Sequence, residues 1–219
     1  MEKTHVKICG LTDPAQAQAA AELGADFIGL VFAESSRYVS HDRARQIVQA
    51  LQGQVPAVGV FVDATAEQIN DTAEQTGIAI AQLHGHELPS ILGEIKIPCI
   101  KAFRIRNAES IVAIHEWLVC IPPDSSLEAV LLDTYSPHAP GGTGERFNWD
   151  LLSEAEQHGG MDDLPPIILA GGLDATNVAQ AIRATQPWAV DVSSGVESSP
   201  GQKDPEKIRA FIEAVNTLM

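Results

Sequence analysis

The sequence predicts an α/β protein folded as a single (β/α)8 barrel with a closed, parallel, eight-stranded sheet over residues 1–219. Three observations favour this fold. Short apolar, β-branched runs alternate with helical patterns along the whole chain. Eight such runs occur, about one per 27 residues, close to the minimum for a β–α–β unit. The runs are also apolar at successive positions, as expected for strands whose outer face is covered by helices.

The predicted strands are short runs rich in Val, Ile, Leu, Ala and Phe. They cover Val6–Cys9, Phe27–Phe32, Ala57–Val62, Ala79–Leu83, Cys99–Phe103, Ala129–Asp133, Ile167–Ala170 and Ala189–Ser193. Helical patterns between them include Pro14–Leu23, Ser40–Leu51, Thr65–Gln75, Asn177–Arg183 and Pro205–Leu218, several of them preceded by a capping residue. A doubly wound open sheet is the alternative fold. The even spacing and the lack of a dinucleotide-binding fingerprint favour the barrel.

The composition narrows the classes of partner. The chain has a net charge of −15, which argues against nucleic acid and against an anionic membrane surface. A small anionic substrate stays compatible, because it needs only a few local donors. Three widely spaced cysteines do not resemble a disulfide framework. With no apolar signal region and no long apolar stretch, we expect a cytoplasmic protein.

Two candidate catalytic residues end predicted strands, where barrel enzymes place their active sites. Cys9 ends the first strand and is followed by Gly10. It is either a reactive thiol or a small buried apolar residue. Asp133 closes the apolar run Val130–Leu132. It is either a cap or loop residue, or a general acid whose pKa is raised by desolvation.

Lys7 and Asp191 are predicted to support Cys9. Strand side chains alternate between faces, so Lys7 and Cys9 share one face. The eighth strand neighbours the first in a closed barrel, which lets Asp191 pair with Lys7 inside it. Our hypothesis is that an inward lysine favours the thiolate form of Cys9.

Two glycine- and serine-rich turns predict a phosphate site. Gly171 and Gly172 follow the seventh strand, and Ser193, Ser194 and Gly195 follow the eighth. These two loops form the frequent phosphate site of barrel enzymes, where backbone N–H groups approach the anion closely.

The stretch Gly141–Gly144, which contains Gly142, is predicted to be a loop over the site. It is not a P-loop, because the Lys-Ser/Thr sequel is missing.

Arg37 and His84 complete the candidate site. Arg37 follows the second strand and either binds a substrate carboxylate or pairs with Glu34 at the surface.

His84 and His86 form a His-x-His pair, but no further ligands occur at convincing spacing, so we expect no metal. We interpret His84 as a hydrogen-bonding residue of the pocket. The remaining cysteines lie in apolar runs and are predicted to be core residues: Cys99 and Cys120.

These motifs, taken in order, resemble phosphoribosylanthranilate isomerases of tryptophan biosynthesis over the full chain. The segments that carry the resemblance are Lys7–Thr12, Ser36–Val39, Gln82–Gly85, Leu132–Asp133, Gly141–Gly144, Leu169–Leu173 and Asp191–Glu197. Ser36 departs from the family, which has proline there. The departure concerns the stiffness of the loop before Arg37 and not the chemistry.

The resemblance implies an aldose–ketose isomerase that carries out an Amadori rearrangement without a cofactor. It implies that Asp133 is the general acid that opens the sugar ring and that Cys9 is the general base that removes the C2 proton. Arg37 would hold the anthranilate carboxylate, and backbone groups of Gly172, Ser194 and Gly195 would hold the phosphate. The expected partner is a small phosphorylated substrate, and the expected assembly is a monomer or homodimer.

Two other functions stay open at this point. One is another sugar-phosphate enzyme of the barrel fold: an epimerase would need a further carboxylate and metal-binding histidines, and indole-glycerol-phosphate synthase a longer N-terminal extension. The other is a phosphate-binding barrel without catalysis, which would be expected to lose Cys9 or Asp133. Activity on the related aminoaldose of the histidine pathway is also left open.

Overall fold

A computed structural model describes residues 3–134, 152, 155, 160–161 and 163–217 of the chain. The predicted loop Gly141–Gly144, with the substrate-binding candidate Gly142, lies outside these residues.

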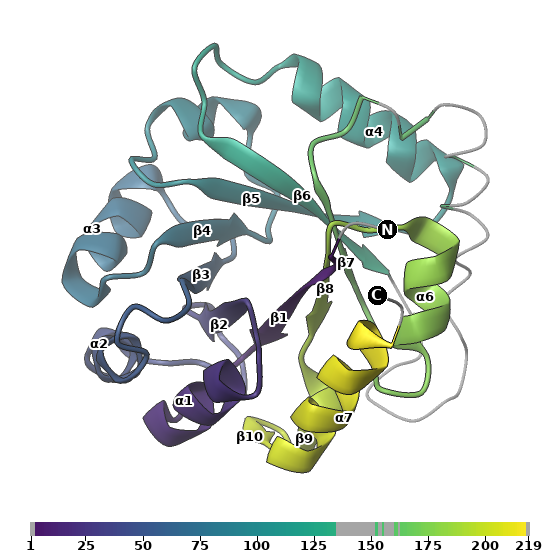
Figure 1. Cartoon of the computed structure of the whole chain (residues 1–219). Coiled ribbons are helices and arrows are strands. Elements are labelled where there is room, and N and C mark those ends of the chain that lie inside the picture. The colour runs from purple at the N-terminus through teal and green to yellow at the C-terminus, as the bar shows by residue number, and fades with distance from the viewer. Residues whose placement is uncertain (1–2, 135–151, 153–154, 156–159, 162, 218–219) are drawn as a thin grey trace.

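Eight parallel strands form a closed barrel in the order of the chain, as the sequence predicts (Figure 1). Closure occurs between the first and last strands, where His5 pairs with Ala189 and Ile8 with Val192. The strand limits differ from the predicted ones by at most two residues at either end. The strands are β1 (His5–Cys9), β2 (Phe27–Val31), β3 (Ala57–Phe61), β4 (Ile80–Leu83), β5 (Cys99–Ile105), β6 (Leu127–Thr134), β7 (Ile167–Ala170) and β8 (Ala189–Val192).

Helices cover the outside of the barrel (Figure 1). Local signals define their ends: Thr65 and Gln68 form a reciprocal capping box, and Gly77 ends that helix with a φ of 80°. After β4 the connection is a 3-10 helix, η1 (Pro89–Gly93), instead of an α-helix. The helices are α1 (Pro14–Glu22), α2 (His41–Ala50), α3 (Ala66–Thr76), α4 (Ala108–Val119), α6 (Val178–Thr185) and α7 (Pro205–Asn216).

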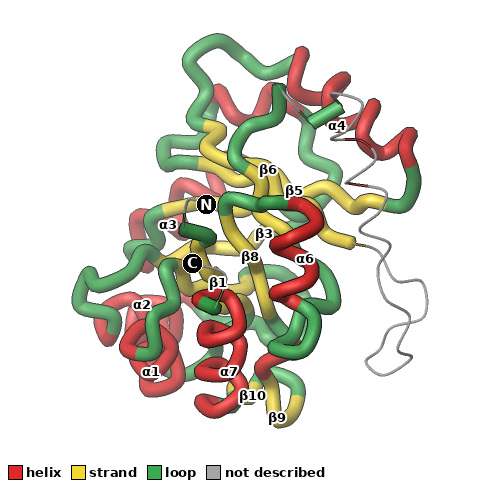
Figure 2. The backbone as a smooth tube through the Cα atoms, turned by 45° about the vertical axis from the view of Figure 1, so that its right-hand side comes forward, coloured by secondary structure: helices red, strands yellow, loops and turns green. Residues whose placement is uncertain are grey.

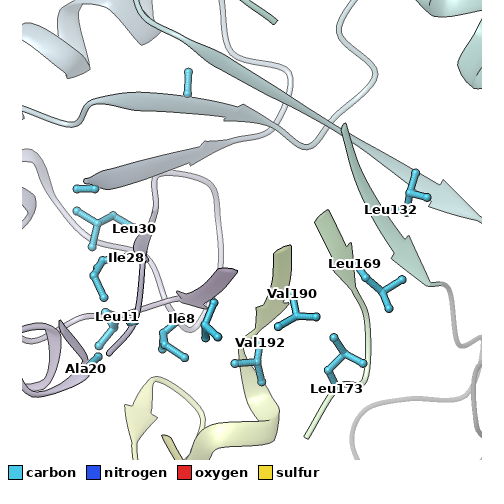
Figure 3. Packing of buried hydrophobic residues seen from close by; sticks show 14 of the residues in the cluster. Ile8, Leu11, Ala20, Ile28, Leu30, Leu132, Leu169, Leu173, Val190 and Val192 are labelled. Carbon is cyan, nitrogen blue, oxygen red and sulfur yellow. The ribbon is translucent and has the colours of Figure 1, made fainter. Parts of the chain in front are cut away.

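The core has two layers, one on each face of the barrel. The outer layer lies between strands and helices, and Figure 3 shows Ile8, Val190 and Leu169 of this layer on three strands of the barrel. The inner layer fills the barrel with apolar side chains, among them Val58, Leu131 and Ile168. Because side chains alternate along each strand, the residues that continue the inner face toward the strand ends include Cys9, Asp133 and Asp191.

A small hairpin that the sequence analysis did not predict follows β8. Strands β9 (Glu197–Ser199) and β10 (Gln202–Lys203) pair in antiparallel fashion between β8 and α7. Figures 1 and 2 both show the hairpin beside α7, at one edge of the barrel. Among the described residues, no helix combines the length and the apolar character needed to cross a membrane.

The prediction that Cys120 is a core residue is wrong. Cys120 is exposed and ends α4 as its C-cap. The face of α4 toward the core carries Ile111, Ile114 and Leu118. Cys120 falls off this stripe because a helical face repeats every three to four residues. The prediction for Cys99 is correct, since its side chain is buried.

Candidate active site

Cys9 lies at the end of β1, next to a buried ion pair. Lys7, two residues earlier on the same face, has a fully buried side chain. Its Nζ is 2.8 Å from Asp191 Oδ1, and the two residues are register partners across β1 and β8. Burial alone would lower the pKa of Lys7, but the negative charge of Asp191, with a smaller contribution from Cys9, outweighs burial and raises it. Lys7 is therefore a cation inside the barrel.

The protonation state of Cys9 differs from the hypothesis based on Lys7. Burial, which disfavours the thiolate, raises the pKa of the Cys9 thiol above its ordinary value. Lys7 lowers this pKa, as predicted, but its effect is smaller than that of burial, and Asp191 acts against it. The sequence indicated the lysine without indicating how completely the thiol is buried, at 8% exposure. Burial therefore favours the neutral thiol over the thiolate at this position.

Gly29 on β2 makes room for this arrangement. It is the register partner of Cys9. A Cβ at this position would lie 2.7 Å from the Cys9 Sγ and 3.1 Å from the Lys7 Nζ. Any larger residue would therefore displace the thiol and the amine. The sequence analysis did not identify Gly29. The signal that could have found it is a glycine in the second strand at the position that pairs with Cys9.

Asp133 ends the inner face of β6 and contacts His84, which follows β4. The His84 Nε2 is 3.3 Å from Asp133 Oδ2. On the other side of the ring, His84 Nδ1 lies 2.9 Å from Gln82 Nε2, so each ring nitrogen has a side-chain partner. The Asp133 side chain is 31% exposed. Asp133 Oδ2 thus has a protein partner, while the carboxyl group also reaches solvent.

His86 does not join His84. Its side chain is 96% exposed, and its Nδ1 is 3.8 Å from Asp63 Oδ2. The two histidines of the His-x-His pair consequently face different surroundings, which agrees with the interpretation of His84 as a hydrogen-bonding residue of the pocket.

Arg37 pairs with Glu197 of the hairpin and not with Glu34. Arg37 Nε and Nη2 donate to the two carboxylate oxygens of Glu197, each at 2.7 Å. The aliphatic part of Arg37 lies against Gly10, where a Cβ would come within 2.4 Å of the Arg37 Cδ. Arg37 therefore lies close to the residue that follows Cys9 and does not extend into solvent. The alternative of a surface pair with Glu34 is wrong.

The turns after β7 and β8 lie against each other. A Cβ on Gly195 would come within 2.0 Å of the Leu173 carbonyl oxygen, so the β8 turn packs directly on the β7 turn. Gly171 and Gly172 both have left-handed φ angles, of 92° and 62°. A Cβ on Gly172 would meet nothing within 4 Å, so the backbone there faces open space. Ser194 begins a short 3-10 turn directly after Ser193.

Cys9 and Asp133 end two strands that are not neighbours in the barrel. Cys9 is on β1 and Asp133 on β6, with β8 and β7 between them in the closed order. The two turns follow these two intervening strands. The two turns therefore lie on the part of the rim between the ends of β1 and β6.

A separate cavity of about 500 Å³ opens beside the ends of β2 and β3, lined by residues such as Phe32, Phe61 and His41. None of the predicted site residues lines it.

The chain is similar to known proteins of one family. A sequence model of the family described as N-(5'-phosphoribosyl)anthranilate (PRA) isomerase matches residues 6–214. A curated relative named N-(5'-phosphoribosyl)anthranilate isomerase, from Geobacter sp. strain M21, is 46% identical over 98% of this chain and 99% of its own length. Another with the same name, from Pseudomonas fluorescens strain SBW25, is 44% identical over 98% and 97%.

Solved structures give the same result. The phosphoribosyl anthranilate isomerase of Thermotoga maritima superimposes with a TM-score of 0.86 at 37% identity, covering 98% of this chain and 99% of that chain. A phosphoribosyl anthranilate isomerase in complex with reduced 1-(o-carboxyphenylamino)-1-deoxyribulose 5-phosphate superimposes with a TM-score of 0.82 at 35% identity, with the same coverage. The chain belongs to the N-(5'-phosphoribosyl)anthranilate isomerase family.

Proposed function

We propose that Cys9 and Asp133 carry out the aldose–ketose isomerisation of N-(5-phosphoribosyl)anthranilate in tryptophan biosynthesis, each on one side of the bound sugar. The observation that carries this assignment is their placement on β1 and β6, with the two glycine-containing turns on the strands between them. An Amadori rearrangement needs one proton delivered and one removed, and two groups on opposite sides of the substrate can do this without a cofactor.

Asp133 acts as the general acid. It delivers a proton to the ring oxygen of the furanose, the ring opens, and the anthranilate nitrogen forms a Schiff base with C1. His84 holds Asp133 Oδ2 at 3.3 Å. This contact helps to orient the carboxyl group of Asp133.

Cys9 acts as the general base. It removes the proton from C2 of the open-chain Schiff base, which becomes an enolamine and then tautomerises to the ketone. The thiol carries no covalent intermediate in this scheme, so no adduct with substrate is expected. Since burial raises the pKa of Cys9, Lys7 is needed to stabilise the thiolate when it forms.

Arg37 and the turns hold the two anionic ends of the substrate. Guanidinium groups bind carboxylates through paired N–H donors, which suits Arg37 to the anthranilate carboxylate. The phosphate is expected at the backbone N–H groups of the two turns, which approach an anion closely because glycine leaves space. The residues proposed for the phosphate are Gly171, Gly172, Ser193, Ser194 and Gly195. The role proposed for Gly142 falls in a segment outside the described residues.

The test is the loss of phosphoribosylanthranilate fluorescence after the purified protein is added. We expect Cys9→Ser and Asp133→Asn each to fold normally by circular dichroism and to lose about 10²- to 10⁴-fold in kcat. Arg37→Ala is expected to raise KM more than it lowers kcat. Turnover near the wild-type rate in Cys9→Ser or Asp133→Asn would remove that residue from the mechanism, and an unchanged KM in Arg37→Ala would remove the carboxylate clamp.

We further propose that residues 1–219 act as one catalytic barrel, in the cytoplasm, as a monomer or homodimer. A phosphoribosylanthranilate isomerase of Thermotoga maritima is described as dimeric, with monomers generated from it. All three cysteines are free thiols, which fits a reducing compartment. Sedimentation velocity over a range of concentrations distinguishes the two assemblies.

A further inference from the structure

A buried ionic cluster ties Arg37 to the β9–β10 hairpin. The Glu197 carboxylate accepts from Arg37 Nε and Nη2 at 2.7 Å each, and from Lys203 Nζ at 2.8 Å. The side chains of Glu197 and Lys203 are 5% and 0% exposed, whereas that of Arg37 is 25% exposed. The cluster is thus buried at the hairpin and open only at the arginine.

The paired contact with Glu197 leaves one edge of the guanidinium for a ligand. A guanidinium carries five N–H groups, and Glu197 takes the Nε–Nη2 edge. The edge formed by Nη1 and Nη2 keeps two parallel N–H groups, which match a second carboxylate. With its stem against Gly10, Arg37 is held at both ends. Glu197 thereby determines which edge of Arg37 faces the site.

The same carboxylate is linked to the β8 turn through Lys203. Lys203 Nζ donates to the Ser193 backbone oxygen at 3.1 Å and lies 3.4 Å from the Ser193 Oγ. Glu197 therefore connects the residue proposed for the anthranilate carboxylate with the turn proposed for the phosphate. This connection makes the spacing between the two anion sites a property of one buried cluster.

The hairpin that carries the cluster is itself anchored to the neighbouring loops. Thr12 Oγ1 donates to the Gly201 carbonyl oxygen at 2.9 Å, and Lys207 Nζ donates to the Glu197 backbone oxygen at 2.6 Å. A Cβ on Gly201 would lie 3.0 Å from the Ser36 carbonyl oxygen, so the hairpin packs on the loop that carries Arg37. Glu197 is therefore a fixed support, and not a mobile surface acid.

Positioning and simple charge make opposite predictions for this cluster. Burial disfavours the charged carboxylate, but Arg37 and Lys203 together outweigh burial and lower the pKa of Glu197 to about 2. Glu197 is thus an anion that partly neutralises Arg37. If only charge mattered, removing the anion would strengthen the binding of a substrate carboxylate. If orientation matters more, removing it would weaken binding.

We propose that Glu197 is a positioning residue that orients Arg37 toward the substrate carboxylate and so determines the preference for a carboxylate-bearing aminoaldose. Lys203 joins this support to the phosphate turn. The inference rests on the proposed role of Arg37 as the carboxylate clamp.

The test measures the affinity of two ligands by titration calorimetry. One is reduced 1-(o-carboxyphenylamino)-1-deoxyribulose 5-phosphate, and the other is its phenylamino counterpart without the carboxylate. Glu197→Gln keeps the shape of the side chain and removes its charge. We expect it to weaken the carboxylate ligand about 10- to 100-fold, the range for a lost hydrogen bond to a charged group. The affinity of the counterpart is expected to change less than about 2-fold, because this ligand has no carboxylate to bond with Arg37.

Two further variants separate the possible failures. Arg37→Ala is expected to abolish the difference between the ligands, and adding Glu197→Gln to it is expected to have no further effect on either. Glu87→Gln is the matched control, since Glu87 forms an equally buried pair with Lys101, at 2.7 Å, away from Arg37. This control is expected to leave the ratio of the two affinities unchanged.

Equal losses for both ligands in Glu197→Gln would overturn the inference, because they would indicate a general structural role. Unchanged or tighter binding of the carboxylate ligand would overturn it too. If Arg37→Ala itself left the ratio of affinities unchanged, the carboxylate clamp of the proposed function would be the part that fails. If Arg37→Ala changed the ratio and Glu197→Gln did not, the proposed clamp would stand and the positioning role would fail.

Discussion

The two sides of the barrel mouth treat their proton-transfer groups differently. On the β1–β8 side, the Cys9 thiol is buried beside the Lys7–Asp191 pair, and both charges act on it. On the β4–β6 side, Asp133 is 31% exposed and its described partner is His84. Charged side chains of the protein therefore act on the base, whereas the acid has, among the described residues, a hydrogen-bond partner in His84 and is open to solvent.

Space around the thiol is expected to have the largest effect. Gly29→Ala would place a methyl group 2.7 Å from the Cys9 Sγ, so the thiol must move. A displacement of about 1 Å in a reacting group can cost about 100-fold in rate, and we expect a loss in kcat of that order. Steady-state kinetics on the purified variant measure it. The control is Gly93→Ala, whose Cβ would make ordinary contacts of 3.6 Å with Pro122. Wild-type kcat in Gly29→Ala would contradict the placement of Cys9.

The charges beside Cys9 are expected to act in opposite directions. Since Lys7 lowers the pKa of Cys9 and Asp191 raises it, Lys7→Met should shift the thiol titration to higher pH and Asp191→Asn to lower pH. Removing one partner of the buried pair is also expected to cost about 3–5 kcal/mol of stability, measured by urea unfolding.

The titration follows the rate of alkylation by iodoacetamide against pH in a Cys99→Ser, Cys120→Ser background. Both other cysteines are replaced because each is a free thiol that would also react, so that Cys9 is the thiol that remains. In the parent protein, kcat/KM should still rise with pH above neutrality, because the base has a raised pKa and must be deprotonated to act. Shifts of the same sign in the two variants would contradict the charge model.

Removing the partner that the described residues give the acid should have a smaller effect. His84→Ala removes the hydrogen bond to Asp133 and is expected to lower kcat about 10-fold, the value of one charge-assisted bond. Stopped-flow measurement of the fluorescence decay gives kcat. The Cys9 titration should not move, because His84 is on the opposite side of the mouth. A coupled change in the titration of Cys9 would show that the two sides do not act separately.

The effect on stability is confined to acid pH. The pKa of Glu197 is lowered from 4.5 to about 2, so its contribution to stability is complete above pH 4.5 and is lost as the pH falls toward 2. In Glu197→Gln, the slope of the free energy of unfolding against pH should fall by up to about 1.4 kcal/mol per pH unit within that window. Above pH 4.5 the slope should be unchanged. Urea midpoints at several pH values between 2 and 6 test this. Parallel pH profiles for the two proteins would contradict it.

The periodic apolar runs determined the fold, because each strand and each helix must bury one face and the spacing leaves one closed arrangement. The same runs located Cys9, Asp133 and the two turns, since parallel strands deliver their ends to one side of a barrel. The pairing of Lys7 with Asp191 also followed from strand alternation and closure. The predicted ends of strands and helices were accurate where an apolar run is followed by glycine or by a capping residue.

Tertiary structure alone decided how these groups are held. No local signal pairs Arg37 with Glu197, 160 residues away, or places Lys203 between Glu197 and Ser193. Whether the pKa of Cys9 is raised or lowered depends on how completely its thiol is buried. Side chains of several strands contribute to this burial, so it cannot be determined from the neighbouring Lys7. The local sequence determined which residues are candidates for the chemistry. Their protonation, orientation and spacing were determined only when packing set the desolvation and the distances between charges.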